Sequence, residues 1–189
     1  MAPEHKQLLK QEPLRTNGKR AAHTVFGITG WKNSGKTTLI EALIREFARR
    51  DIRVSAIKHA HHDFDIDIPG KDSYRHREAG AQQVLVASHQ RWALMQELRG
   101  SDAPNLSELL ALLAPCDLVL VEGFKHDRHP KIEVVRVLGP EGRIADNDDT
   151  IRAIATLDPA FAGTHLSLEL DDIVGIADFI CVQCGVSGG

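Results

Sequence analysis

The feature that most restricts the fold of this sequence is a loop that begins at Gly30. Its residues are Gly30-Trp31-Lys32-Asn33-Ser34-Gly35-Lys36-Thr37, which follow the pattern G-x-x-x-x-G-K-[ST]. A short, β-branched apolar run (24–29) precedes the loop, and apolar residues at helical spacing (37–50) follow it. Glycines let the backbone wrap closely around phosphate groups, and the helix N-terminus adds positive potential. The pattern therefore predicts a phosphate-binding loop between a buried strand and a helix.

The side chains of the loop have separate chemical roles in this interpretation. Lys36 is expected to reach the β- and γ-phosphates of a nucleotide, and the Thr37 hydroxyl to hold Mg²⁺. Lys32 is one residue late for the extra lysine of some dimeric phosphate-loop proteins, and we interpret it as a surface charge. The predicted nucleotide-binding residues of the loop are Gly30, Asn33, Ser34, Gly35, Lys36, Thr37 and Thr38.

A second apolar strand ends in a carboxylate, in the segment Leu118-Val119-Leu120-Val121-Glu122-Gly123. Proteins with a phosphate loop place an acid at such a strand end to hold Mg²⁺ or its water. Ligands gather at the carboxyl ends of parallel strands. We therefore expect Glu122 at the metal rather than Asp117, which precedes the strand. Lys36 and Glu122 are the predicted catalytic residues.

The order of elements predicts an α/β protein. Strand and helix patterns alternate, which is typical of a parallel sheet with crossovers. Two strand-like runs, Gln83–Ser88 and Arg91–Leu98, are separated by two residues and predict an antiparallel hairpin that joins the sheet. The predicted fold is a three-layer P-loop NTPase fold with a mostly parallel sheet, occupying residues 24–184. Residues 1–23 are expected to be a disordered basic tail, and 185–189 a flexible end.

Composition and charge exclude several classes of protein. The net charge of −3 does not describe a general nucleic-acid binder, although residues 1–23 carry +3 and the remainder −6. The longest apolar run, residues 109–114, has six residues, whereas a membrane-spanning helix needs roughly 20. Three cysteines and no apolar leader indicate a reducing compartment. We therefore expect a cytoplasmic protein with no membrane and no specific nucleic-acid partner.

The segment that follows the second strand is unusually rich in histidine and aspartate. In an extended chain, one face would present His59, His61, Asp63, Asp65 and Asp67. Three hypotheses remain open. The segment senses the nucleotide and brings Asp63 or Asp67 toward Mg²⁺, it forms a separate metal site, or it is a solvated face without chemistry.

Several motifs, taken together, resemble the MobB family of molybdopterin-guanine dinucleotide biosynthesis adapter proteins. The resemblance covers about residues 25–179. The motifs that carry it are Lys58-His59, His61-His62-Asp63, Asp65-Ile66-Asp67, Pro69-Gly70-Lys71-Asp72-Ser73-Tyr74, Ala79-Gly80-Ala81, Ala87-Ser88-His89-Gln90-Arg91-Trp92-Ala93-Leu94-Met95 and Leu118–Lys125.

The resemblance implies a phosphate-loop fold, a homodimer, and GTP binding with Mg²⁺ and weak hydrolysis. It also implies assistance to the guanylyltransferase that joins GMP to molybdopterin, with molybdopterin itself as a further candidate ligand. The loop roles carry over to residues 30–38 and the acidic role to Glu122. The family's hairpin-like insertion falls on Val84–Leu98 and is a candidate dimer-forming element.

Guanine specificity has no complete sequence motif here. The N/T-K-x-D pattern of many GTPases is absent, and Lys125-His126-Asp127 lies early for a base-binding loop. Asp158 follows the last predicted strand, where a base contact is better placed, and is the preferred candidate. The leading hypothesis is a GTP-binding adapter. The alternatives are a small-molecule kinase that uses ATP and a metal-binding accessory protein.

Overall fold

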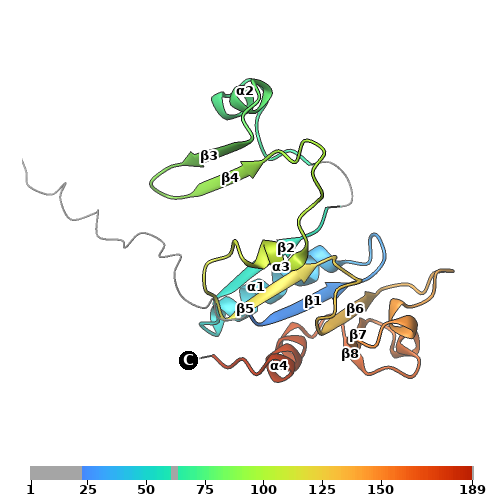
Figure 1. Cartoon of the computed structure of the whole chain (residues 1–189). Helices are drawn as coiled ribbons and strands as arrows, with labels where there is room; N and C mark the ends of the chain where they lie inside the picture. The colour runs from blue at the N-terminus through green and yellow to red at the C-terminus, as the bar shows by residue number, and fades with distance from the viewer. Residues whose placement is uncertain (1–22, 61–63, 189) are drawn as a thin grey trace, which may run out of the picture.

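The main body of the protein is a six-stranded sheet, shown in Figure 1. The computed structural model describes residues 23–60 and 64–188. The strand order is β2-β5-β1-β6-β7-β8, and every adjacent pair is parallel. The strands are β1 (Val25–Thr29), β2 (Val54–Lys58), β5 (Leu118–Glu122), β6 (Lys131–Val135), β7 (Ile151–Thr156) and β8 (Ser167–Glu169).

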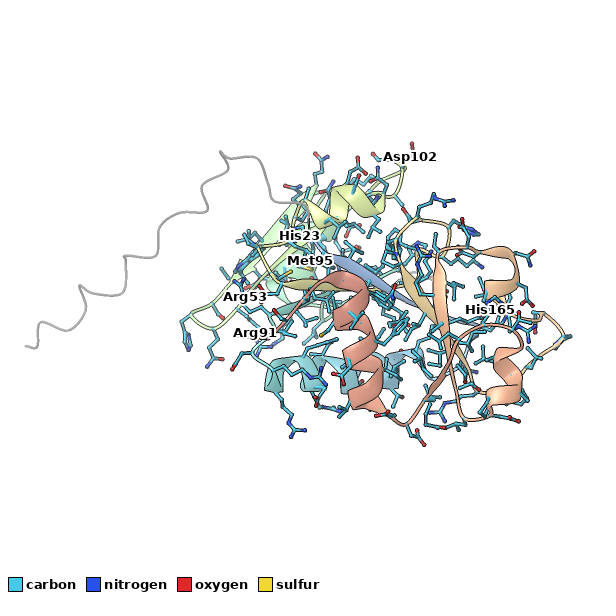
Figure 2. All side chains as sticks on the ribbon, turned by 90° about the horizontal axis from the view of Figure 1, so that it is seen from below. His23, Arg53, Arg91, Met95, Asp102 and His165 are labelled. Atoms are coloured by element: carbon cyan, nitrogen blue, oxygen red, sulfur yellow. The ribbon has the colours of Figure 1, made fainter. Side chains whose placement is uncertain are left out.

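Helical elements cover both faces of this sheet, so the predicted three layers are confirmed. Alternate residues of β5 enter two cores: Leu118 and Leu120 face one, Val119 and Val121 the other. Figure 2 shows the first face, with two neighbouring helices on it. These are α1 (Lys36–Arg49) and α4 (Ile173–Cys184), and the opposite face carries α3 (Leu106–Leu110), η2 (Ile144–Asn147) and η3 (Pro159–Ala162).

The predicted hairpin exists, but the prediction that it joins the main sheet is wrong. Strands β3 (Gln83–Ala87) and β4 (Trp92–Gln96) form a sheet of their own. Together with α2 (Asp72–Glu78) they make an arm, residues 64–100, that stands away from the main body in Figure 1. Among the described strands, the hairpin pairs only with itself.

Arg77 makes most of the ion pairs that hold the arm together. The Arg77 guanidinium pairs with the carboxylates of Asp65, Asp67 and Glu97 at 2.8–3.3 Å. It also lies 5.5 Å from the centre of the Tyr74 ring. These hydrogen bonds raise the pKa of Arg77, chiefly through Asp65. The arm is therefore organised by polar contacts rather than by an apolar core.

Strand β6 carries an unusual strip of polar residues into the interior. Lys131 and Glu133 are fully buried. The Lys131 ammonium donates to the Asp127 carbonyl and the Thr150 hydroxyl, both at 2.7 Å. Glu133 accepts hydrogen bonds from the first two amides of η2, each at 2.9 Å. These bonds hold two loops against this face of the sheet. The loops are residues 123–130, between β5 and β6, and residues 136–150, between β6 and β7.

His129 extends the same strip and is 7% exposed. Neither ring nitrogen has a hydrogen-bond partner among the described residues. The Cβ that Gly27 lacks would lie 2.5 Å from His129 Nε2, so glycine makes room for the ring. Burial lowers the pKa of His129 to about 4, and Lys131 acts in the same direction, while Asp127 and Asp148 oppose it.

This burial predicts a specific loss of stability in mild acid. The unfolded chain protonates His129 near pH 6.5, whereas the folded protein does so only near pH 4. Between these values the unfolded state binds more protons, so the free energy of unfolding should fall by up to about 3 kcal/mol as the pH drops. Urea unfolding of the natural protein and His129→Leu across this range measures the difference. Equal pH slopes in the two proteins would contradict the prediction.

Candidate functional site

The phosphate loop lies at the carboxyl edge of the sheet, between β1 and α1. A Cβ on Gly30 would lie 2.6 Å from the Val134 carbonyl oxygen, so only glycine fits there. Asn33 and Gly35 adopt left-handed conformations, with φ of 64° and 95°. Gly35 caps α1 without a side-chain hydrogen bond, and the first turn has no acidic residue. The N-terminal amides of α1 are thus available to an anion.

The structure brings Lys36, Thr37 and Glu122 together. Lys36 Nζ donates to the Trp31 carbonyl at 2.6 Å. Thr37 Oγ1 lies 3.4 Å from Glu122 Oε1, and Lys58 Nζ lies 3.3 Å from the other carboxylate oxygen. Burial lowers the pKa of Lys36, and Glu122 opposes the shift. A hydroxyl and a carboxylate oxygen on adjacent elements suit Mg²⁺, which prefers oxygen ligands.

Asp117 lies at the opposite end of β5 from Glu122, as expected. Its carboxylate forms a two-pronged ion pair with Arg53, at 2.7 and 3.0 Å. That pairing lowers the pKa of Asp117. Glu122 is therefore the acid of this strand that faces the loop.

The carboxylates of the histidine-rich segment have other placements. Asp63 lies outside the described residues. Asp67 accepts from the Ser73 hydroxyl at 2.7 Å and pairs with Arg77 in the arm, so its carboxylate does not join Thr37 and Glu122. Within the described residues, no three His, Cys, Asp or Glu side chains gather in a way that could hold a metal ion. The segment does bring Lys58 and His59 to the site, because the His59 amide donates to the Glu122 carbonyl.

Asp158 lies at the carboxyl edge too, immediately beyond β7. Its carboxylate accepts from the Ala160 amide at 2.9 Å and so begins η3. The strand order places it two strands from the phosphate loop, on the side away from Glu122. Its contact with a base stays a prediction.

A cleft of about 460 Å³ opens beside the phosphate loop, between residues 123–130 and residues 136–150. The Trp31 indole N–H donates to the Gly142 carbonyl at 2.8 Å, and the Lys125 ammonium lies 5.4 Å from the centre of the Trp31 ring. Asp127 is on the wall of this cleft. Trp31 thus joins the phosphate loop to both of these connecting segments.

Arg136 is the site residue that the sequence did not reveal. It is the first residue after β6, and its Nε would lie 2.6 Å from a Cβ at Gly35. The apolar pattern of the sequence predicts a strand over Ile132–Leu138, which puts Arg136 in the strand interior. The strand in fact ends at Val135, which places Arg136 at the carboxyl end of β6, where ligands gather in parallel sheets.

The fold and the loop define a P-loop NTPase-like α/β protein. The family model described as molybdopterin guanine dinucleotide synthesis protein B matches residues 25–157, and the chain belongs to that family. A molybdopterin-guanine dinucleotide biosynthesis adapter protein of Escherichia coli is 42% identical over 161 residues, covering 82% of this chain and 90% of the relative. The Haemophilus influenzae protein of the same description is 44% identical over 159 residues, covering 82% and 86%.

Solved structures show the same fold. A MobB homologue from Bacillus stearothermophilus superposes with a TM-score of 0.64 at 29% identity, covering 86% of this chain and 98% of the other. Bacillus subtilis MobB superposes with a TM-score of 0.68 at 24% identity, covering 88% and 99%. Within the described part of the chain, no helix is long and apolar enough to cross a membrane.

The placement of Thr37 predicts a magnesium-specific defect. Thr37→Val would remove the hydroxyl that is expected to hold Mg²⁺ while keeping the side-chain shape. We expect nucleotide affinity measured with Mg²⁺ to fall on the order of tenfold, and affinity measured with EDTA to change little. Thr37→Ser, which keeps the hydroxyl, is the matched control. Equal losses with and without Mg²⁺ would contradict the assignment.

Proposed function

We propose that this protein is a GTP-binding adapter in the synthesis of molybdopterin guanine dinucleotide. In this role it assists the guanylyltransferase that joins GMP to molybdopterin. The observation that carries the proposal is the grouping of Lys36, Thr37 and Glu122 at a phosphate loop. Family membership and the description of the two bacterial relatives support the pathway.

The site chemistry favours binding over rapid turnover. Lys36 and the α1 amides would hold the phosphates, and bound Mg²⁺ would neutralise their charge. Thr37 and Glu122 would hold the metal. The Glu122 carboxylate is shared between Thr37 and Lys58, so it is poorly placed to activate a water. We therefore expect GTP hydrolysis to be weak, and the protein to act in the cytoplasm mainly as an adapter.

The hydrogen bonds around Glu122 suggest how an adapter could report its nucleotide. Lys58 and His59 both contact Glu122, and the chain continues from them toward the arm. A Cβ on Gly123 would lie 2.8 Å from the His59 Cβ, so the two backbones pack closely. A shift of Glu122 on binding metal would therefore move Lys58 and His59, from which the chain leads to the arm.

Calorimetric titration with GTP, GDP and ATP in the presence of Mg²⁺ tests the proposal. We expect GTP and GDP to bind and ATP to bind more weakly. Lys36→Ala should weaken GTP binding at least tenfold, because it removes a charged contact to phosphate. Lys71→Ala, an exposed lysine of the arm, is the matched control. Unchanged GTP affinity in Lys36→Ala would place the site elsewhere, and equal or tighter ATP binding would favour the small-molecule kinase.

The arm supports the proposal of a homodimer. Leu85 and Leu94 face each other across the hairpin and are 61% and 42% exposed. Trp92 is 61% exposed. A contiguous exposed apolar surface of this kind marks an interaction site, and the unpaired edges of a two-stranded sheet invite a further strand.

Charging this surface should separate the protomers. The double variant Leu85→Glu/Leu94→Glu would bury carboxylates in the interface, and we expect the dimer dissociation constant to rise on the order of 100-fold. Val182→Glu, at an exposed apolar position on α4, is the control. Analytical ultracentrifugation measures both. A natural protein that sediments as a monomer, or a double variant that remains dimeric, would overturn the proposal.

A further inference from the structure

We propose that Arg136 binds the phosphate groups that GDP and GTP have in common, from the side of the loop opposite Glu122. The inference rests on the proposed nucleotide site, and it adds a second cation to that site.

The position of Arg136 follows from the packing of the loop on β6. Gly30 lies against the backbone of Val134, two residues before Arg136. The Arg136 side chain then crosses to Gly35, the residue immediately before Lys36, and occupies the space that a Cβ there would take. A strand neighbouring β1 thus delivers a guanidinium to the start of α1, where the helix amides are uncapped.

The charge of Arg136 is not consumed within the protein. The side chain is exposed, and no carboxylate forms an ion pair with it among the described residues. Several other arginines are neutralised by carboxylates: Arg50 by Glu46, Arg53 by Asp117, Arg77 by Asp65 and Arg143 by Asp146. Arg91, Arg99 and Arg152 form no ion pair among the described residues either, but they lie on the arm and at the start of β7, away from the phosphate loop. An unneutralised cation directly on a phosphate loop is suited to an anion, and a guanidinium can contact two phosphate oxygens at once.

The two sides of the loop carry different groups, and this decides which phosphates Arg136 would reach. Strand β5 supplies Glu122 on one side of β1, and β6 supplies Arg136 on the other. The metal-binding pair Thr37 and Glu122 marks the end of the site where the γ-phosphate and Mg²⁺ belong. Arg136, at the other side, therefore lies nearer the phosphates that GDP also has.

The charge-removing variant Arg136→Gln tests this. We expect the affinities for GDP, GTP and inorganic pyrophosphate all to fall, on the order of 10- to 100-fold, and to become less dependent on salt. Arg136→Lys should recover part of the loss, because it restores charge without the fork. Arg152→Gln, an exposed arginine on β7, is the matched control and should bind as the natural protein does. Thermal unfolding verifies that all three variants are folded.

The outcomes separate this inference from the proposed function. Unchanged affinities in Arg136→Gln overturn it. A loss confined to GTP overturns it by placing the guanidinium at the γ-phosphate. A loss for GDP without a loss for pyrophosphate overturns it by placing the guanidinium on the nucleoside. Lys36→Ala tests the phosphate loop independently of Arg136. Failure of the natural protein to bind any nucleotide would overturn the proposed function instead.

Discussion

The contact on which the rest of the site depends is the close approach of Gly30 to the Val134 carbonyl. It sets the phosphate loop against β6, because any side chain at Gly30 would collide with that backbone. Strand β6 in turn holds the surroundings of the loop through its buried charges. Lys131 binds the carbonyls of Lys125 and Asp127, and the Lys125 side chain lies over Trp31. Burying an ammonium is costly unless it is hydrogen-bonded. The hydrogen bonds of Lys131 therefore hold residues 123–130 in place beside the phosphate loop.

The arm uses the opposite solution. It has little apolar interior, and Arg77 compensates by gathering three carboxylates and stacking near Tyr74. Because ionic contacts organise the inside of the arm, its leucines and Trp92 are left on the surface. The same choice takes Asp65 and Asp67 away from the nucleotide site. Asp65 and Asp67 thus serve the architecture of the arm, while Lys58 and His59 contact Glu122 at the candidate site.

The sequence was sufficient for the loop between a strand and a helix, for the mostly parallel sheet, and for the placement of Glu122 and Asp117 at opposite ends of β5. These follow from local patterns and from the rule that ligands gather at carboxyl strand ends. It was insufficient where tertiary contacts override a local pattern. Val137 and Leu138 extend the apolar run of β6, yet the ladder with β7 ends at Val135, so Arg136 was hidden in a predicted strand. β8 and the separate hairpin sheet were missed because neither is encoded by periodicity alone.

The candidate functional side chains lie along the carboxyl edge of the sheet in strand order. Lys58 and Glu122 end β2 and β5, the phosphate loop follows β1, and Arg136 and Asp158 follow β6 and β7. Opposite charges on the first pair compensate each other, whereas Arg136 faces the loop without a carboxylate among the described residues. The two sides of the loop are therefore electrostatically unequal. A polyanion bound across this edge would have Glu122, the proposed metal-binding carboxylate, at one end and the uncompensated guanidinium of Arg136 further along. This difference in charge would fix the orientation of the polyanion in the site.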